Sequence, residues 1–297
     1  MASHDEDEGV DCGETRHLRR IETIISNDPS YMRMNSVINL LGSGISRIPR
    51  LEWERVGPND LSATACLVRT YRSLQSAVHL LLFGYYGEVR VLLRTAYECA
   101  ALSRMLAKNP KLADKWMRKD HWFPDREVRN WWASVQDEDS ASSDDAGAIY
   151  ASAYRMMSSW AHPTFMSCAP LVISTDTQSN GPEYQLKVSF NETGFLYLIK
   201  EIAGAALFGC FALRNAAVDE RAMDPAWRQA LYSLAREITE HEMPQLERNW
   251  EEENSQYELL RGRIQTAEQL EVRLRNDPLS WQNLHRPGGD ADTSEPS

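Results

Sequence analysis

Apolar residues recur every three or four positions along most of this chain, which is the spacing of amphipathic helices. In 88–108 the apolar positions cover most of the helix circumference, which is typical of a central, buried helix. Pro225 suits the first turn of a long final helix that Pro244 should kink or split. The predicted helices span 15–27, 31–48, 59–83, 88–108, one or two short helices within 110–136, 192–218 and 225–275.

One segment has the pattern of strands instead. Residues 184–190 alternate apolar and polar side chains, and they follow a turn-rich Ser179-Asn180-Gly181-Pro182 that is itself preceded by an apolar run. This arrangement predicts a small β-hairpin over 170–190. The expected fold class is therefore all-α, a helical bundle with a small β-hairpin insert and a long kinked C-terminal helix.

The acidic residues mark the ends of the expected domain. Of a formal net charge of −11, most comes from the tails, because residues 1–14 hold six acidic side chains and no lysine or arginine. We expect disordered tails over 1–14 and 283–297, and a single helical domain over 15–282 with a core of 58–218 and a C-terminal helical arm of 225–275. The nearly neutral body argues against tight nonspecific DNA binding, which needs a basic surface.

The cysteines and the apolar runs indicate a cytoplasmic location. The five cysteines are scattered without a Cys-x-x-Cys pair, which favours reduced thiols. The N-terminus is acidic, unlike a signal peptide. The longest apolar run, 202–213, has twelve residues, too few to span a bilayer, so no membrane partner is expected.

Two residues near the end of a predicted helix are candidates for catalysis. Arg155 and His162 lie seven positions apart and so fall on one stripe, and Pro163 biases His162 toward the helix end. An imidazole can transfer a proton near neutral pH, and a guanidinium can bind an anion, with Tyr154 beside it as a supporting residue. Alternatively, His162 caps the helix and Arg155 is an ordinary surface charge.

Three charged residues at four-residue spacing lie within the apolar helix 88–108: Arg90, Arg94 and Glu98. They form either an internal salt bridge that ties helices together or the support of an anion pocket, in which Glu98 orients His162 and Arg94 binds the anion. Both interpretations place Arg94 and Glu98 in the bundle core. His79, within an apolar run, is expected to be a core histidine.

No pattern for a metal or cofactor site is present. Glu237, Glu240 and His241 lack the Glu-x-x-His spacing of di-metal bundles, and clustered cysteine or histidine ligands for zinc are missing. Glycine-rich phosphate-binding motifs are also missing. We therefore expect neither a metal nor a cofactor.

With these residues in place, the chain resembles a known family. Arg155-x6-His162 at a helix end of an all-helical chain is similar to the Arg-x(4–6)-His motif of HEPN proteins (higher eukaryote and prokaryote nucleotide-binding). The stretches 92–98 and 158–163 also resemble a group of uncharacterised bacterial helical proteins classed as domains of unknown function, over roughly 60–215.

The HEPN resemblance implies metal-independent RNA cleavage, as in toxins and phage-defence effectors. His162 would assist attack by the ribose 2′-hydroxyl or protonate the leaving oxygen, and Arg155 would bind the scissile phosphate. A homodimer with the two motifs facing each other is implied. The other hypothesis from the sequence is a non-catalytic helical protein that binds a protein partner or a small anionic ligand.

Overall fold

The computed structural model describes residues 14–48, 56–119, 123, 125–134, 192–216 and 224–241, with isolated positions between 255 and 276. The chain divides into two compact units, Met1–Glu247 and Arg248–Ser297, and the helices discussed below all belong to the first. Within the described residues every element is a helix and no strand occurs. The expected hairpin at 170–190 and the expected arm beyond residue 241 lie outside the described residues.

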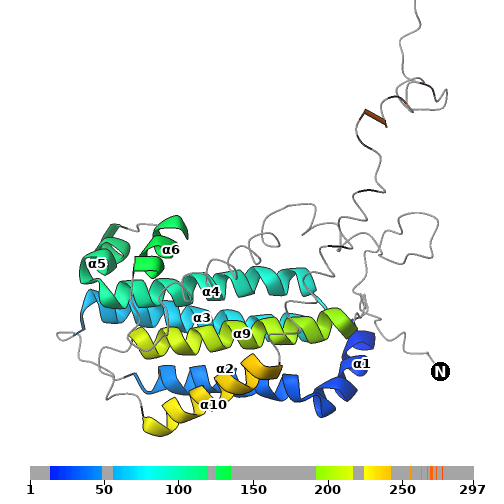
Figure 1. Cartoon of the computed structure of the whole chain (residues 1–297), viewed down its shortest axis with the longest axis horizontal. Coiled ribbons are helices and arrows are strands. Elements are labelled where there is room, and N and C mark those ends of the chain that lie inside the picture. The colour runs from blue at the N-terminus through cyan, green and yellow to red at the C-terminus, as the bar shows by residue number, and fades with distance from the viewer. Residues whose placement is uncertain are drawn as a thin grey trace, which may run out of the picture. The chain divides into compact units, whose positions relative to one another are not determined.

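The described helices confirm the predicted periodicity closely, and the short aromatic-rich region forms two of them. They are α1 (Glu14–Asn27), α2 (Pro29–Ser46), α3 (Pro58–Leu82), α4 (Tyr86–Lys108), α5 (Pro110–Lys119), α6 (Asp125–Ser134), α9 (Glu192–Ala216) and α10 (Pro225–His241) (Figure 1).

Local signals set the boundaries of α3. Its cap is Gly57, whose backbone N–H donates to the Asp60 carboxylate at 3.2 Å, so the helix begins at Pro58 with a proline in its first turn. At the other end, Gly84 adopts a φ of 86°, a left-handed conformation that favours glycine. The chain therefore turns back there and enters α4.

Four long helices, α2, α3, α4 and α9, form the bundle, in which α9 contacts each of the other three (Figure 1). α3 and α4 are antiparallel neighbours, and the buried Thr70 hydroxyl of α3 donates to the Ala96 carbonyl of α4 at 3.3 Å. Tyr97 of α4 and Phe208 of α9 stack with ring centroids 5.2 Å apart. The α4–α9 contact joins helices that are far apart in the sequence.

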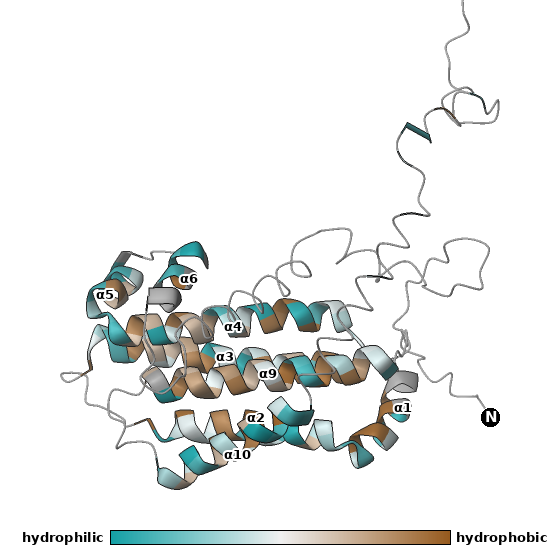
Figure 2. Ribbon diagram, viewed as in Figure 1, coloured by the Kyte–Doolittle hydropathy of each residue, from teal (hydrophilic) through white to brown (hydrophobic). Residues whose placement is uncertain are grey.

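α9 is the central apolar helix, and it is brown along most of its length in Figure 2. It is long and apolar enough to cross a membrane, yet 83% of its most apolar window is buried inside the bundle. Phe195, Ile199, Ile202 and Ala206 are each 0% exposed. This burial is typical of a core helix within a bundle.

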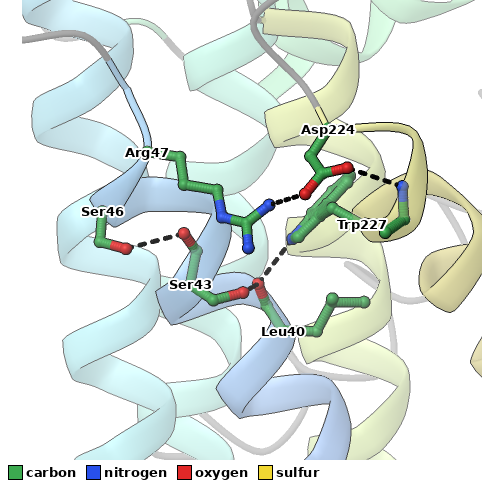
Figure 3. Close-up of polar contacts among 7 residues, drawn as sticks. Leu40, Ser43, Ser46, Arg47, Asp224 and Trp227 are labelled. Carbon is green, nitrogen blue, oxygen red and sulfur yellow. Dashed lines mark hydrogen bonds and ion pairs between the residues drawn. The ribbon is translucent and has the colours of Figure 1, made fainter.

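α10 is attached to the end of α2 by polar contacts (Figure 3). The Asp224 carboxylate accepts the Ala226 backbone N–H at 2.9 Å and pairs with Arg47 at 2.7 Å, and the Trp227 indole donates to the Leu40 carbonyl at 2.9 Å. The backbone bond and Arg47 lower the pKa of Asp224. This residue thus caps α10 and links the helix to α2.

Candidate functional site

The predicted catalytic pair falls within residues 135–191. Arg155, His162 and the supporting Tyr154 all lie outside the described residues, so their convergence stays a prediction. The described part of the candidate site consists of Arg90, Arg94 and Glu98, on the N-terminal half and middle of α4.

Arg94 and Glu98 form the predicted pair, but they do not lie in the core. Arg94 Nε is 2.9 Å from Glu98 Oε1, and their side chains are 19% and 40% exposed. The reason is helix geometry: a step of four residues turns about 400°, which is about 40° past a full turn. The stripe that starts at Arg90, 8% exposed, therefore rotates outward through Arg94 to Glu98.

The buried charged residue of this stripe is Arg90, and it pairs with a residue of α9. Arg90 Nε lies 3.6 Å from Glu201 Oε2, and these side chains are 8% and 1% exposed. The Arg90 guanidinium also lies over the ring of Tyr197, 5.4 Å from its centroid. The pair ties α4 to α9 in the bundle interior, as the internal salt-bridge interpretation requires, although with a different partner.

Burial and the charge of Glu201 affect a neighbouring tyrosine. Tyr97 is 8% exposed, and burial, followed by the negative charge of Glu201, raises the pKa of its hydroxyl. Both effects disfavour the phenolate, so Tyr97 is a neutral hydrogen-bonding group rather than a base.

Sequence reasoning did not assign Glu201 to this site. Glu201 and Lys200 are adjacent charges within an otherwise apolar helix, and both are buried, at 2% and 8% exposure. Such a charge in a buried helix requires a partner of opposite sign, and this was the signal available in the sequence. The identity of the partner depends on which helices are neighbours, and periodicity does not provide that information.

A second buried arginine lies near the other end of α4. Arg104 is 4% exposed, and its guanidinium lies over the Trp131 ring of α6, 6.0 Å from the centroid. Lys115 of α5 lies over Phe123 in a similar way, at 5.9 Å. These cation–π contacts attach α5 and α6 to the bundle through a separate small apolar cluster.

His79 is exposed, contrary to the core position expected from its apolar neighbours. It lies two residues from Ala77 and two from Leu81, which are both 0% exposed. A step of two residues turns a helix by about 200°, so the position between two buried ones points away from the core. His79 is therefore on the outer face of α3.

The described cysteines have properties of structural thiols. Cys66, Cys99 and Cys210 are free, and burial raises the pKa of each, to about 11 for Cys99. A thiol is a weak nucleophile while it is protonated. Within the described residues no three histidine, cysteine or acidic side chains are grouped closely enough to bind a metal ion.

Comparison with known proteins gives one family match. Residues 60–146 match a family of unknown function (DUF5677). The matched segment covers most of α3 and all of α4, α5 and α6, and it ends before Arg155 and His162. No curated protein and no solved structure matches the chain. The chain is therefore similar to a family of unknown function over this segment, and the match assigns no activity.

Proposed function

We propose that this protein is a HEPN-like, metal-independent endoribonuclease that acts as a homodimer, in the manner of a toxin or phage-defence effector. The observation that carries the proposal is the Arg155-x6-His162-Pro163 motif in a chain whose described part is an α-helical bundle. The motif supplies a fixed cation and a group able to transfer a proton near neutral pH.

The proposed reaction uses these two groups, and water accepts or supplies the second proton. His162 takes the proton of the ribose 2′-hydroxyl, or donates one to the departing 5′-oxygen, while Arg155 neutralises charge on the phosphoryl oxygens. The 2′-oxygen forms a new bond to phosphorus as the bond to the 5′-oxygen breaks. The products are a 2′,3′-cyclic phosphate and a free 5′-hydroxyl.

The contacts of α4 favour a second candidate, a non-catalytic helical protein that binds a protein partner or a small anionic ligand. Arg90 pairs with Glu201 and Arg94 pairs with Glu98, so both arginines have structural partners. Under either function, these residues hold the scaffold, and chemistry depends on Arg155 and His162.

The test is RNA cleavage in the presence of a chelator. The full chain is compared with Arg155→Ala and His162→Ala, and with the matched controls Arg236→Ala and His241→Ala, two exposed residues of α10. We expect cleavage by the wild type and both controls, loss in both motif variants, and 2′,3′-cyclic phosphate ends by mass spectrometry. Intact RNA in every sample, or equal cleavage by the motif variants, would refute the ribonuclease proposal and favour the binding protein.

A further inference from the structure

Beyond its first turn, which contains Asp60, the solvent-facing side of α3 carries positive charge and no negative charge. No acidic residue occurs between Asp60 and Glu88. Several other residues of α3 are exposed, and their side chains are basic, neutral polar or apolar. The exposed residues of α3 are Leu61, Ala65, Arg69, Arg72, Gln75, Ser76 and His79.

Two exposed arginines and a histidine follow one side of α3. Arg69 and Arg72 are separated by about one helical turn, and His79 lies two turns, or about 10.5 Å of rise, beyond Arg72. Neither arginine forms an ion pair with another described residue. Their guanidinium groups are therefore available to an external anion.

The surface without acidic residues continues onto the neighbouring helix. α2 also contains no aspartate or glutamate between Pro29 and Ser46. The two helices are in close contact, since a Cβ added at Gly42 would lie 2.8 Å from the Tyr71 ring. Ser36 and Asn39 are exposed on α2 and offer neutral hydrogen-bonding groups.

Other described surfaces have a different character. Exposed carboxylates occur on α1 at Glu22, at the start of α4 at Glu88, on α6 at Glu127 and on α10 at Glu240. The chain as a whole has a formal net charge of −11. Most of that charge lies in the tails, so the nearly neutral body neither attracts nor repels a polyanion strongly as a whole. Attraction is expected locally, where exposed arginines occur without neighbouring carboxylates on the same face.

We infer that the exposed face of α3, around Arg69, Arg72 and His79, is the surface along which the phosphate backbone of single-stranded RNA binds. This inference rests on the proposed ribonuclease function and assigns its substrate-binding surface. Two arginines on one side of a helix suit the backbone of a linear polyanion, and Gln75 and Ser76 can bond phosphate or sugar oxygens. Two guanidinium groups provide too few phosphate contacts for tight nonspecific binding of duplex DNA.

The test measures binding separately from cleavage. His162→Ala provides the background in the full chain, so that a labelled oligouridylate stays intact during fluorescence anisotropy. The test variant adds Arg69→Glu and Arg72→Glu. The matched control adds Arg126→Glu and Arg236→Glu, which reverse two exposed arginines of α6 and α10 and change the net charge equally. Circular dichroism melting checks folding, and Arg69→Gln with Arg72→Gln provides a neutral version.

We expect the α3 reversal to weaken oligouridylate binding about tenfold or more at low salt, and the control to weaken it less than about twofold. The dependence of log affinity on log salt should become shallower by about 1 to 1.5 in the α3 variant, because each phosphate contact to a single strand contributes about 0.7. Equal weakening by both double variants, no weakening by the α3 variant, or no binding by the background protein would overturn the inference. Equally effective competition by polyglutamate would overturn it in favour of an acidic protein partner.

RNA cleavage by variants that retain His162 distinguishes failure of the surface assignment from failure of the ribonuclease proposal. If the wild type cleaves RNA and the α3 variants bind and cleave as well as it does, the surface assignment fails and the proposed function stands. If no sample cleaves RNA but the α3 reversal alone abolishes binding, the surface assignment stands and the ribonuclease fails.

Discussion

Removal of one partner from the buried Arg90–Glu201 pair should destabilise the bundle strongly. At the 3.6 Å separation of Arg90 Nε and Glu201 Oε2, an effective dielectric constant of about 20 gives a Coulomb attraction of roughly 4–5 kcal/mol. The attraction is opposed by a desolvation cost of several kcal/mol for each ion. The net value of the pair is therefore small, but each single substitution removes the opposite charge of this pair from a charge that stays buried.

We expect Glu201→Met or Arg90→Met alone to lower the free energy of unfolding by about 3–5 kcal/mol. The double variant should lose less unfolding free energy than either single variant. It buries two apolar side chains of similar length and leaves neither charge of the pair uncompensated. The coupling in the double-mutant cycle should then exceed about 2 kcal/mol. Urea unfolding followed by far-ultraviolet circular dichroism and by tryptophan fluorescence measures each free energy.

Arg94 and Glu98 provide the matched control on the same helix. Their side chains are 19% and 40% exposed, so the same methionine substitutions should show a coupling below about 1 kcal/mol, reduced by salt. The pair is not coupled if the losses of unfolding free energy caused by Arg90→Met and Glu201→Met simply add in the double variant. A loss below about 1 kcal/mol for Glu201→Met would equally contradict the prediction.

Three further predictions concern packing, capping and thiol chemistry. Gly44→Ala should lower stability by about 1–3 kcal/mol because its Cβ would lie 2.6 Å from a neighbouring side chain, whereas Gly262→Ala, with nothing within 4 Å, should not lower it in a thermal melt. Asp224→Ala should lower the melting temperature, and Asp224→Asn should recover the part that comes from capping α10. Because the pKa of Asp224 is lowered in the folded protein, its contribution to stability is present above the unfolded-state pKa and is lost on acidification. A melting temperature of Asp224→Asn that depends on acid in the same way as the wild type would contradict this. Because burial raises the pKa of Cys99 from 9.0 to about 11, stability should fall as the pH rises from 9 to 11, and less steeply in Cys99→Ala. Iodoacetamide labelling of Cys99 near neutral pH, located by peptide mass spectrometry, should be slow. Rapid labelling of Cys99 in the native protein would contradict the assignment.

The local part of the fold was predictable because it depends on short stretches of sequence. Helix periodicity and the punctuation by Gly84 and Pro225 identified α3, α4, α9 and the start of α10 to within a few residues. The burial of single side chains was less predictable. Glu98 and His79 lie among apolar neighbours in the sequence, yet the 100° turn per residue places both on outward faces.

Pairing between distant helices could not be predicted from the sequence, because it depends on which helices the fold makes neighbours. Arg90 and Glu201 are separated by α5, α6 and residues 135–191, and no local pattern connects them. The adjacent charges Lys200 and Glu201 within an apolar helix indicated a buried partner without identifying it. By contrast, the Arg94–Glu98 pair is local, because residues four positions apart on a helix are neighbours, although the sequence analysis expected both residues in the core.

The contacts of α4 also change what the candidate site requires. A buried arginine that already pairs with Glu201 would have to exchange that partner for an external anion, and this exchange would weaken the ion pairing of Glu201, which is 1% exposed. Such a cost makes Arg90 a poor anion ligand and a good link between α4 and α9. Arg69 and Arg72 have no such cost, because water already solvates them. Charge that serves binding is therefore expected on the outer face of α3, and charge that serves the fold is found in the interior between α4 and α9.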